Sequence, residues 1–332
     1  MGQTVVFTVA LDDDNVAIER REPRPPRRTF RDSANAALRD RHWHLALAAC
    51  FVIPAVAAAV TFAITRGAWV TTAALVAAAL VTPASGAWAG NRGLTGDWGA
   101  RVAAWAVTGL AGAALALASV PLVIVTALAE EWDESAAVPT LSVLAISGAG
   151  GAWFGLALGL RERAWNRAAA AVATVVIALA PLGVAAALLP RTSVTEAISS
   201  YGFTATYAGN RPAYLCSEET VQVTRQHSED VAWIAFASPL AWVVDAPQFT
   251  AAQLAAAPDG TVAQAQAWTR SSRVGPDDFV GYCYKATSLG RPLAVQLARY
   301  ETAGPIGATV AVAFVGLVGA IALYGASRRR SA

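Results

Sequence analysis

Six apolar segments, each long enough to cross a lipid bilayer as a helix, dominate this sequence. A spanning α-helix needs about 20 consecutive apolar residues, and we expect spans at about 43–65, 68–89, 102–129, 138–160, 168–189 and 305–326. Only 14% of the residues are charged and 55% are hydrophobic, whereas a soluble domain carries roughly 25% charged residues. The sequence therefore predicts a polytopic α-helical membrane protein with six transmembrane helices. It also predicts an α+β extracytoplasmic domain inserted between helices 5 and 6.

The arginine residues alternate between the connections of these segments. They are concentrated before the first span, between spans two and three, between spans four and five, and after span six. The connection between spans three and four is acidic instead, with Glu130, Glu131, Asp133 and Glu134. Because positively charged connections stay in the cytoplasm, we expect both termini to be cytoplasmic and residues 190–304 to lie outside. We expect a multi-pass protein of the cytoplasmic (inner) membrane, and the preference for Arg over Lys suggests a GC-rich bacterial genome.

This topology divides the chain into four parts. The cytoplasmic amino-terminal segment would contain a short hairpin, with strands near 4–11 and 15–20, followed by a linker rich in Pro and Arg. The four expected parts are this segment at 1–41, a five-helix transmembrane region at 42–189, the outer domain at 190–304, and the sixth helix with a basic tail at 305–332.

The outer region has mixed secondary-structure signals. Runs rich in Val, Ile, Thr and aromatic residues predict strands, and these runs lie at 213–216, 220–225, 231–236, 240–244, 279–285 and 293–299. Thr250 and Thr261 are suitable N-cap residues for helices over 251–257 and 262–271. Trp233, Trp242 and Trp268 either belong to the core or line a surface groove. We expect the core, because aromatic residues within apolar runs are usually buried.

Two of the three cysteines, Cys216 and Cys283, lie in the outer region. An oxidising compartment favours a disulfide between them, and closing so long a loop would stabilise the fold by about 4 kcal/mol. The alternatives are two separate thiols or a pair of metal ligands. Cys50 lies inside the first span and is expected to pack as a small apolar residue.

The predicted spans contain packing residues and lack central charged residues. Ser147, Gly151, Gly155 and Gly159 recur every four residues in span four, which predicts a helix face that a neighbouring helix can approach closely. Proline residues lie within spans one, two, three and five, namely Pro54, Pro83, Pro121 and Pro181. Helix packing explains both features, and moving broken helices of a transporter are the alternative. Proton relays and voltage sensors normally keep charged residues in their spans.

No catalytic, cofactor or metal site can be assigned from sequence motifs. His227 is the only histidine in the outer region, and Asp230 lies nearby, but a catalytic triad is defined by geometry rather than by sequence proximity. The chain has no phosphate-binding Gly-x-x-x-x-Gly-Lys loop and no zinc-ligand spacing. The outer charges nearly balance, which gives no indication of nucleic-acid binding.

These observations favour a non-enzymatic membrane protein whose outer domain binds a partner or supports a cell-envelope complex. Its expected partners are the lipid bilayer and either another protein or a second copy of the chain, while a small-molecule substrate cannot be named. The alternative is a permease-like subunit for an apolar or amphipathic substrate, energised by a separate ATPase. A third hypothesis is an enzymatic outer domain that uses His227.

Overall fold

The computed structural model describes residues 35, 39–65, 69–91, 98–132, 134–159, 166–208, 211–275, 279–280 and 305–328. Within them, six helical segments are long and apolar enough to cross a membrane. Their boundaries agree with the predicted spans to about one helical turn. The segments are Arg41–Thr65, Val70–Gly90, Trp98–Ala129, Ala136–Gly159, Arg167–Thr192 and Gly307–Gly325. The prediction of a mostly helical chain with six helices suited to span a membrane is therefore confirmed.

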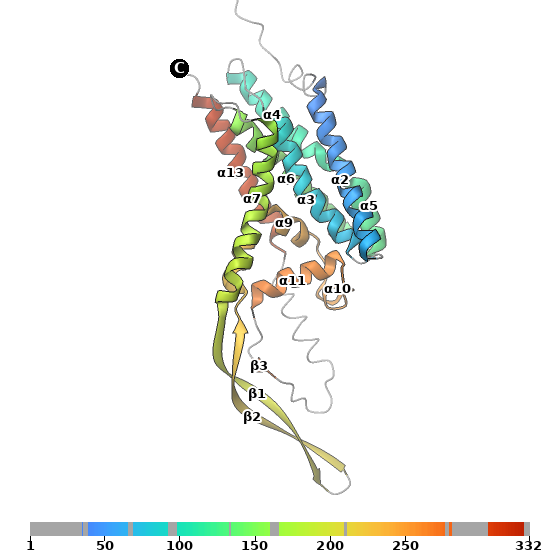
Figure 1. Ribbon diagram of the computed structural model, residues 1–332, viewed down its shortest axis with the longest axis vertical. Coiled ribbons are helices and arrows are strands. Elements are labelled where there is room, and N and C mark those ends of the chain that lie inside the picture. The colour runs from blue at the N-terminus through green and yellow to red at the C-terminus, as the bar shows by residue number, and fades with distance from the viewer. Residues whose placement is uncertain are drawn as a thin grey trace, which may run out of the picture.

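These segments form an antiparallel bundle, called the helical base here (Figure 1). Its helices are α2 (Arg41–Thr65), α3 (Val70–Gly90), α4 (Trp98–Ala114), α5 (Val120–Ala129), α6 (Glu134–Gly159), α7 (Arg167–Leu188) and α13 (Gly307–Arg328), with the 3-10 turn η1 (Leu115–Ser119) between α4 and α5. The start of α2 and the end of α13 lie at the same end of the base, at the top of Figure 1. Everything described between α7 and α13 lies toward the other end.

Helix α6 is the centre of the base, because it packs against α3, α4, α7 and α13. Glycine permits the closest approach: a Cβ atom on Gly151 or Gly155 would lie almost on a backbone carbonyl oxygen of α3, at Pro83 or Ala87 respectively. On the side facing α4, Gly148 lies in similar backbone contact with Gly112. Small residues thus let neighbouring backbones touch, as in other membrane helix pairs.

Two tryptophan side chains connect α4, α6 and α13. The rings of Trp105 and Trp153 stack with centroids 4.8 Å apart and planes 4° from parallel. The indole of Trp105 donates to the carbonyl of Gly319 at 3.0 Å, and the indole of Trp153 donates to the carbonyl of Trp105 at 3.1 Å. These bonds satisfy both polar indole groups within the helix bundle.

The described residues between α7 and α13 form a long hairpin and four short helices. After the 3-10 turn η2 (Leu189–Thr192) come β1 (Ser193–Ala208) and β2 (Arg211–Gln226). The helices are α8 (Glu229–Ala235), α9 (Pro239–Asp245), α10 (Ala251–Ala255) and α11 (Val262–Val274), followed by the short strand β3 (Phe279–Val280). We call α8–α11 the cap region and β1–β2 the hairpin.

The strand predictions were partly wrong. The runs at 213–216 and 220–225 do lie in β2, but 231–235 is helical in α8 and 240–244 is helical in α9. Short apolar runs do not distinguish a strand from a buried helix, and Ser238 followed by Pro239 is a helix start that outweighs the apolar run. The caps at Thr250 and Thr261 are confirmed, because each side chain accepts a bond from the amide three residues later.

The hairpin extends away from the base, as Figure 1 shows. Its two strands pair in antiparallel register without interruption from Ser193 opposite Gln226 to Ala208 opposite Arg211. With 16 residues in each strand and a rise of about 3.3 Å per residue, the hairpin is about 50 Å long. Strand β3 pairs with β1 in parallel, which gives the sheet order β2-β1-β3.

The cap region shares one hydrophobic core with the helical base. The core contains Trp242 and Val243 of α9 together with Leu75 of α3 and Leu144 of α6, and all four are nearly inaccessible to solvent. The two sets of side chains therefore exclude water together. Of the predicted core tryptophans only Trp242 is buried: Trp233 is 71% exposed and Trp268 is 56% exposed, which corrects the sequence-based expectation.

Several predicted elements lie outside the described residues. They are the amino-terminal hairpin at 4–11 and 15–20, the strand at 293–299, and most of the strand at 279–285. Cys283 also lies outside, as does the side chain of Cys216 on β2. The Cys216–Cys283 disulfide therefore stays a prediction.

Candidate functional site

Helix α9 is inserted among the helices of the base. Ser238 is its N-cap: the hydroxyl accepts from the amide of Leu240 at 3.2 Å and donates to the carbonyl of Ala178 at 2.6 Å. Ala178 lies in the middle of α7, next to Ile177, whose carbonyl lacks its usual helical donor because Pro181 has no amide. The short apolar helix α9 is thus attached to the interior of a spanning helix and contacts α3, α6 and α13 as well.

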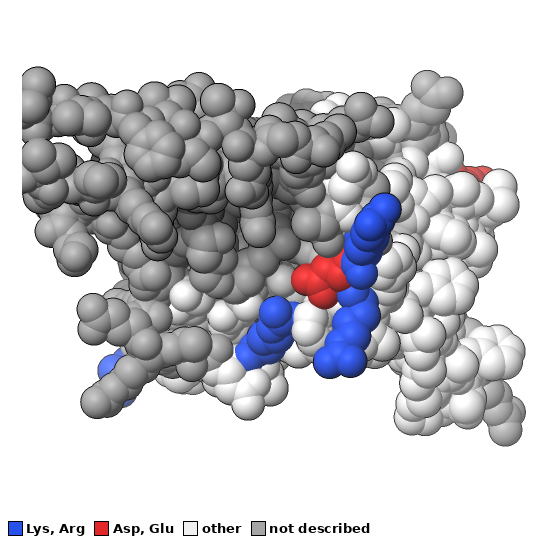
Figure 2. All heavy atoms as spheres, turned by 90° about the horizontal axis from the view of Figure 1, so that it is seen from above, with Lys and Arg blue, Asp and Glu red and all other residues white. Residues whose placement is uncertain are grey.

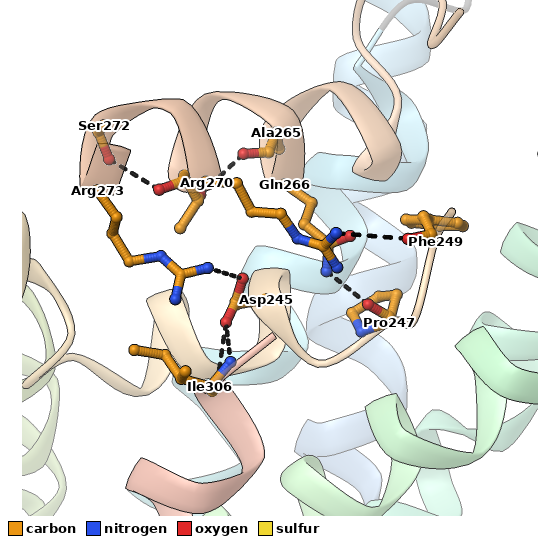
Figure 3. A network of polar contacts seen from close by, with 11 residues as sticks. Asp245, Pro247, Phe249, Ala265, Gln266, Arg270, Ser272, Arg273 and Ile306 are labelled. Carbon is orange, nitrogen blue, oxygen red and sulfur yellow. Dashed lines mark hydrogen bonds and ion pairs between the residues drawn. The ribbon is translucent and has the colours of Figure 1, made fainter. Parts of the chain in front are cut away.

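Asp245, the last residue of α9, accepts bonds from the first turn of α13. Its Oδ2 accepts from the amides of Ile306 and Gly307 at 2.7 and 2.9 Å, and its Oδ1 accepts from Arg273 of α11 at 3.2 Å (Figure 3). The side chain is fully buried. Burial raises the pKa of the Asp245 carboxyl, and Arg273 and the two amides offset part of that rise. One carboxylate thereby joins α9, α11 and α13, and its negative charge complements the positive end of the α13 dipole.

Two further side chains of α11 attach the loop that follows α9. Gln266 donates to the carbonyl of Pro247 at 2.6 Å, and Arg270 donates to the carbonyl of Phe249 at 3.4 Å (Figure 3). Both side chains are almost completely buried. Burial lowers the pKa of Arg270, and the nearby Asp245 partly restores it. These contacts fix the path of the chain between α9 and α10.

The other end of α11 is attached to the base by Glu130. Both carboxylate oxygens accept from the amide of Val262, the first residue of α11, at 3.2 and 3.0 Å. Thr71 at the start of α3 and the indole of Trp132 also donate to this carboxylate. Glu130 belongs to the connection that the sequence identified as acidic, and the structure places it at the amino end of a cap helix, where a negative charge is favourable.

His227 lies where the hairpin meets the cap region. Its Nδ1 is 2.7 Å from Oε1 of Glu229, and its Nε2 is 3.7 Å from Oε1 of Glu196 on β1. The hydrogen bond to Glu229 raises the pKa of His227. The hydroxyl of the neighbouring Ser228 donates to the carbonyl of Ser272 on α11. The described contacts of His227 are thus with the carboxylates of Glu196 and Glu229 and, through its amide, with the carbonyl of Thr192 just before β1.

An apolar cleft of about 140 Å³ lies between α7 and α13. Both helices pack against other parts of the bundle, and α6 forms the cleft wall between them with Ser147, Gly150 and Gly151. Pro239 and Trp242 of α9 close one side. The remaining lining residues are Pro83, Phe154, Thr174, Ile177, Ala178, Ala237, Phe314, Val315 and Val318.

Ser147 is the one polar lining side chain whose hydrogen bonding is incomplete. It is 3% exposed, and its buried hydroxyl has no hydrogen-bond partner. The other lining hydroxyl, on Thr174, donates to the carbonyl of Ala170 at 2.9 Å. A buried hydroxyl without a partner is unfavourable by about 1–3 kcal/mol. The Ser147 oxygen is itself inaccessible, so the open volume of the cleft has an apolar surface.

The four predicted packing residues of α6 do not all contact the same neighbour. Gly151 and Gly155 pack against α3, and Gly151 also lines the cleft, as does Ser147. Gly159 is the last residue of α6. Cys50 is buried at the contact between α2 and α3. Among the residues that the structure describes, no three His, Cys, Asp or Glu side chains are grouped to hold a metal ion.

Sequence reasoning did not identify Asp245, Glu130 or the β1 strand as parts of a site. Asp245 is bonded to residues 61 and 62 positions later in the chain, a distance over which sequence spacing gives no signal. The sequence matches no family model, and no similar curated protein or solved structure was found.

Proposed function

We propose that this non-enzymatic membrane protein presents the region between α7 and α13 outside the cytoplasm, where the hairpin docks a protein of a cell-envelope complex. The observation that carries the proposal is the hairpin of about 50 Å that continues directly from α7 through η2. The cap region at its base is attached to the spanning helices by the buried carboxylate of Asp245 and the partly buried carboxylate of Glu130. A rigid base and a projecting hairpin suit a protein that holds a partner at a fixed distance from the membrane.

The hairpin offers a backbone edge for such a partner. Within the described residues the sheet order is β2-β1-β3, so β2 has a strand neighbour on one side only. An extended protein segment can add to such an edge through main-chain hydrogen bonds, while its side chains provide specificity. The partner expected from this chemistry is an extended segment of another protein, or the β2 edge of a second copy of this chain.

The distribution of arginine supports an outward-facing hairpin. Figure 2 views the end at which α2 begins and α13 ends, and shows basic side chains gathered there around a small acidic group. Described basic residues near this end are Arg39, Arg41, Arg101 and Arg167. Because basic ends of spanning helices remain in the cytoplasm, the opposite end with the hairpin would face outward.

Cysteine labelling tests this orientation. In a cysteine-free background, Gln222→Cys on β2 should react with a membrane-impermeant maleimide in intact cells. Ser331→Cys near the carboxyl terminus should react only after lysis. The reverse pattern would contradict the outward hairpin and with it the docking proposal.

A shortened hairpin tests docking itself. Thr195 and Thr224 are register partners whose hydroxyls are 3.0 Å apart, so residues 196–223 can be replaced by Asn-Gly, which favours a two-residue turn. This variant also carries Cys283→Ser, and its control keeps the whole hairpin with Cys216→Ser and Cys283→Ser. After crosslinking in cells, we expect the control to retain a defined crosslinked partner that the shortened variant loses. Equal recovery from both, or from neither, would contradict the proposal.

The apolar cleft favours a second candidate function, a permease-like subunit for an apolar or amphipathic substrate that works with a separate ATPase. A cleft between two spanning helices gives such a substrate a route from the bilayer. This candidate predicts that cells lacking the protein accumulate lipophilic compounds differently. Unchanged accumulation across a panel of such compounds would count against it.

A further inference from the structure

We propose that the cap region binds the lipid surface around the helical base. Trp233 of α8 and Trp268 of α11, together with Trp69 before α3, would insert at the boundary between lipid headgroups and acyl chains. The first two side chains are largely exposed, whereas Trp242 and Phe249 of the same region are buried. The inference rests on the level of these rings along the spanning helices, and it holds whether or not the hairpin docks a protein.

Two hydrogen bonds fix the level of α8 along α7. The amide of His227, before α8, donates to the carbonyl of Thr192 at 3.0 Å. The hydroxyl of Ser238, after α8, donates to the carbonyl of Ala178 at 2.6 Å. Helix α8 lies between these two attachments and packs against α7. Trp233 is midway between them in the chain, which places it about 10 Å from the level of Thr192, toward the middle of α7, at 1.5 Å per residue.

The uncharged length of α7 locates the membrane boundary. Arg167 and Arg191 are 24 positions apart with no charged residue between them, and a helix of that length measures about 36 Å. A hydrocarbon core about 30 Å thick, centred on this segment, ends about 3 Å before Arg191. Trp233 then lies about 6 Å inside the boundary. Amphipathic helices on a membrane surface bury their apolar side to a similar depth of about 5–10 Å.

The sequence around α8 changes in polarity at this level. Residues 226–230 are Gln-His-Ser-Glu-Asp, whereas residues 231–237 have no polar side-chain group except the indole of Trp233. That indole donates to the carbonyl of Asp230 at 2.7 Å, on the polar side of the change. Tryptophan is enriched at membrane interfaces because it combines a large apolar ring with one polar group. The position of Trp233 therefore suits the headgroup boundary.

A second exposed tryptophan lies at the same boundary on α11. Trp69 immediately precedes α3, whose 21 residues measure about 31 Å and so match the hydrocarbon core. The rings of Trp69 and Trp268 are in contact, with centroids 5.6 Å apart. The hydroxyl of Thr72 also donates to the carbonyl of Gly260 at 2.9 Å, which holds the loop before α11 against α3. Helix α11 thus lies across the end of the base, as Figure 1 shows.

The level of these rings favours lipid over a water-soluble partner. Helix α7, on which α8 rests, lies at the edge of the base with little of its length buried. A side chain that is exposed beside α7 at membrane depth meets lipid. The rings of Trp233 and Trp268 would anchor two cap helices in the same bilayer that surrounds the spanning helices.

Spin labels on the full-length protein, reconstituted alone in phosphatidylcholine vesicles, test this depth. In a cysteine-free background, a nitroxide is attached at Trp233→Cys or Trp268→Cys. The references are Val176→Cys, exposed in the middle of α7, and Gln222→Cys, exposed on β2. Oxygen concentrates in lipid and a nickel chelate stays in water, so the ratio of their collision rates with the label reports depth. We expect the highest ratio at Val176, the lowest at Gln222 and intermediate ratios at both tryptophan positions.

A second measurement uses the protein without substitutions. Phosphatidylcholine that carries a diazirine close to its headgroup should label peptides of α8 and α11 and leave β2 unlabelled. Thermal unfolding of each spin-labelled variant verifies that it is folded.

Two outcomes would overturn the proposal. Collision ratios at Trp233 and Trp268 equal to that at Gln222 would show that both rings face water, where they would be available to a soluble partner. Ratios equal to that at Val176 would place them within the hydrocarbon core instead of at its boundary. Intermediate ratios together with a failure of hairpin docking would count against the proposed function and support this inference.

Discussion

The cap region and the hairpin are adjacent in sequence but are attached to the base in different ways. The cap region shares a hydrophobic core with the spanning helices and is joined to them by Asp245, Glu130 and Ser238. The described part of the hairpin is held mainly by its own strand pairing and by a few partly exposed contacts near His227. Exposure at its start is high, with Val194 51% exposed.

This difference indicates a division of roles. The cap region is part of the structure that the spanning helices form, so changes in it should affect the stability of the whole protein. The hairpin can change with little effect on that structure, which is expected of a segment that binds a partner. Substitutions in the two regions, and in the base that carries them, test this difference.

Asp245→Ala is expected to lower the free energy of unfolding most. The substitution leaves the buried Arg270 and the partly buried Arg273 without their carboxylate, and removal of one partner from a buried ion pair costs about 3–5 kcal/mol. Asp245→Asn retains an acceptor for the α13 amides, so it should lower the free energy of unfolding by less than Asp245→Ala. The matched change in the hairpin is Glu196→Ala, which removes a partly exposed ion pair with Arg225 and should cost less than about 1 kcal/mol. Thermal unfolding in detergent measures the stability of all three variants. Equal losses of stability in Asp245→Ala and Glu196→Ala would contradict the difference between the cap region and the hairpin.

Gly151→Ala should disturb the base on which the cap region rests. Its Cβ would collide with the Pro83 carbonyl of α3, and overpacking of this kind costs about 1–3 kcal/mol. The control is Gly183→Ala on α7, where nothing lies within 4 Å of the new Cβ. We expect a lower unfolding temperature for the first variant only, and a similar value for both would show that α3 and α6 are not in close contact.

Glu130→Gln should loosen α11 without unfolding the base. The variant loses the negative charge that accepts hydrogen bonds from the Val262 amide at the amino end of α11. We expect the free energy of unfolding to fall by about 1 kcal/mol. Exchange of the α11 amides with deuterated water should become faster. The exposed neighbour Glu131 provides the control, and an identical exchange pattern for Glu130→Gln and Glu131→Gln would argue against this attachment.

The smallest expected effect is at His227. Glu229 raises its pKa through a hydrogen bond, so the contact of imidazolium with carboxylate is fully present below the ordinary value of about 6.5 and is lost as the pH rises through the raised pKa. Glu229→Gln should lower the His227 pKa toward its ordinary value in a nuclear magnetic resonance titration. Asp230→Asn should change it less, because Asp230 acts only through space. An unchanged titration in Glu229→Gln would contradict the described geometry.

The parts of this fold that follow from local sequence were predictable. Six apolar segments gave the spans to about a helical turn, and Thr250 and Thr261 gave two helix starts in the cap region. The run 240–244 was misread as a strand because its apolar residues are buried on all sides within the base, an arrangement that has no helical periodicity. Strand β1 was missed because Ser, Thr and Gly interrupt its apolar residues.

The candidate site depended on contacts between distant residues. The sequence identified Ser147 as a packing residue, but its unpaired hydroxyl and the cleft appear only when α7, α9 and α13 are assembled around α6. The acidic connection around Glu130 indicated only the orientation of the chain in the membrane. The hydrogen bond from the Val262 amide to Glu130 joins residues 132 positions apart. No local pattern predicts such a pair.

Hydrogen–deuterium exchange of the full-length protein in lipid nanodiscs, followed over increasing denaturant, tests the central claim most directly. Amides of α9 and α11 should exchange with the same free energy of opening as those of α6, because the cap region and the base unfold together. Amides of β1 and β2 should open at a distinctly lower free energy. A cap region that opens with the hairpin, independently of α6, would contradict this account.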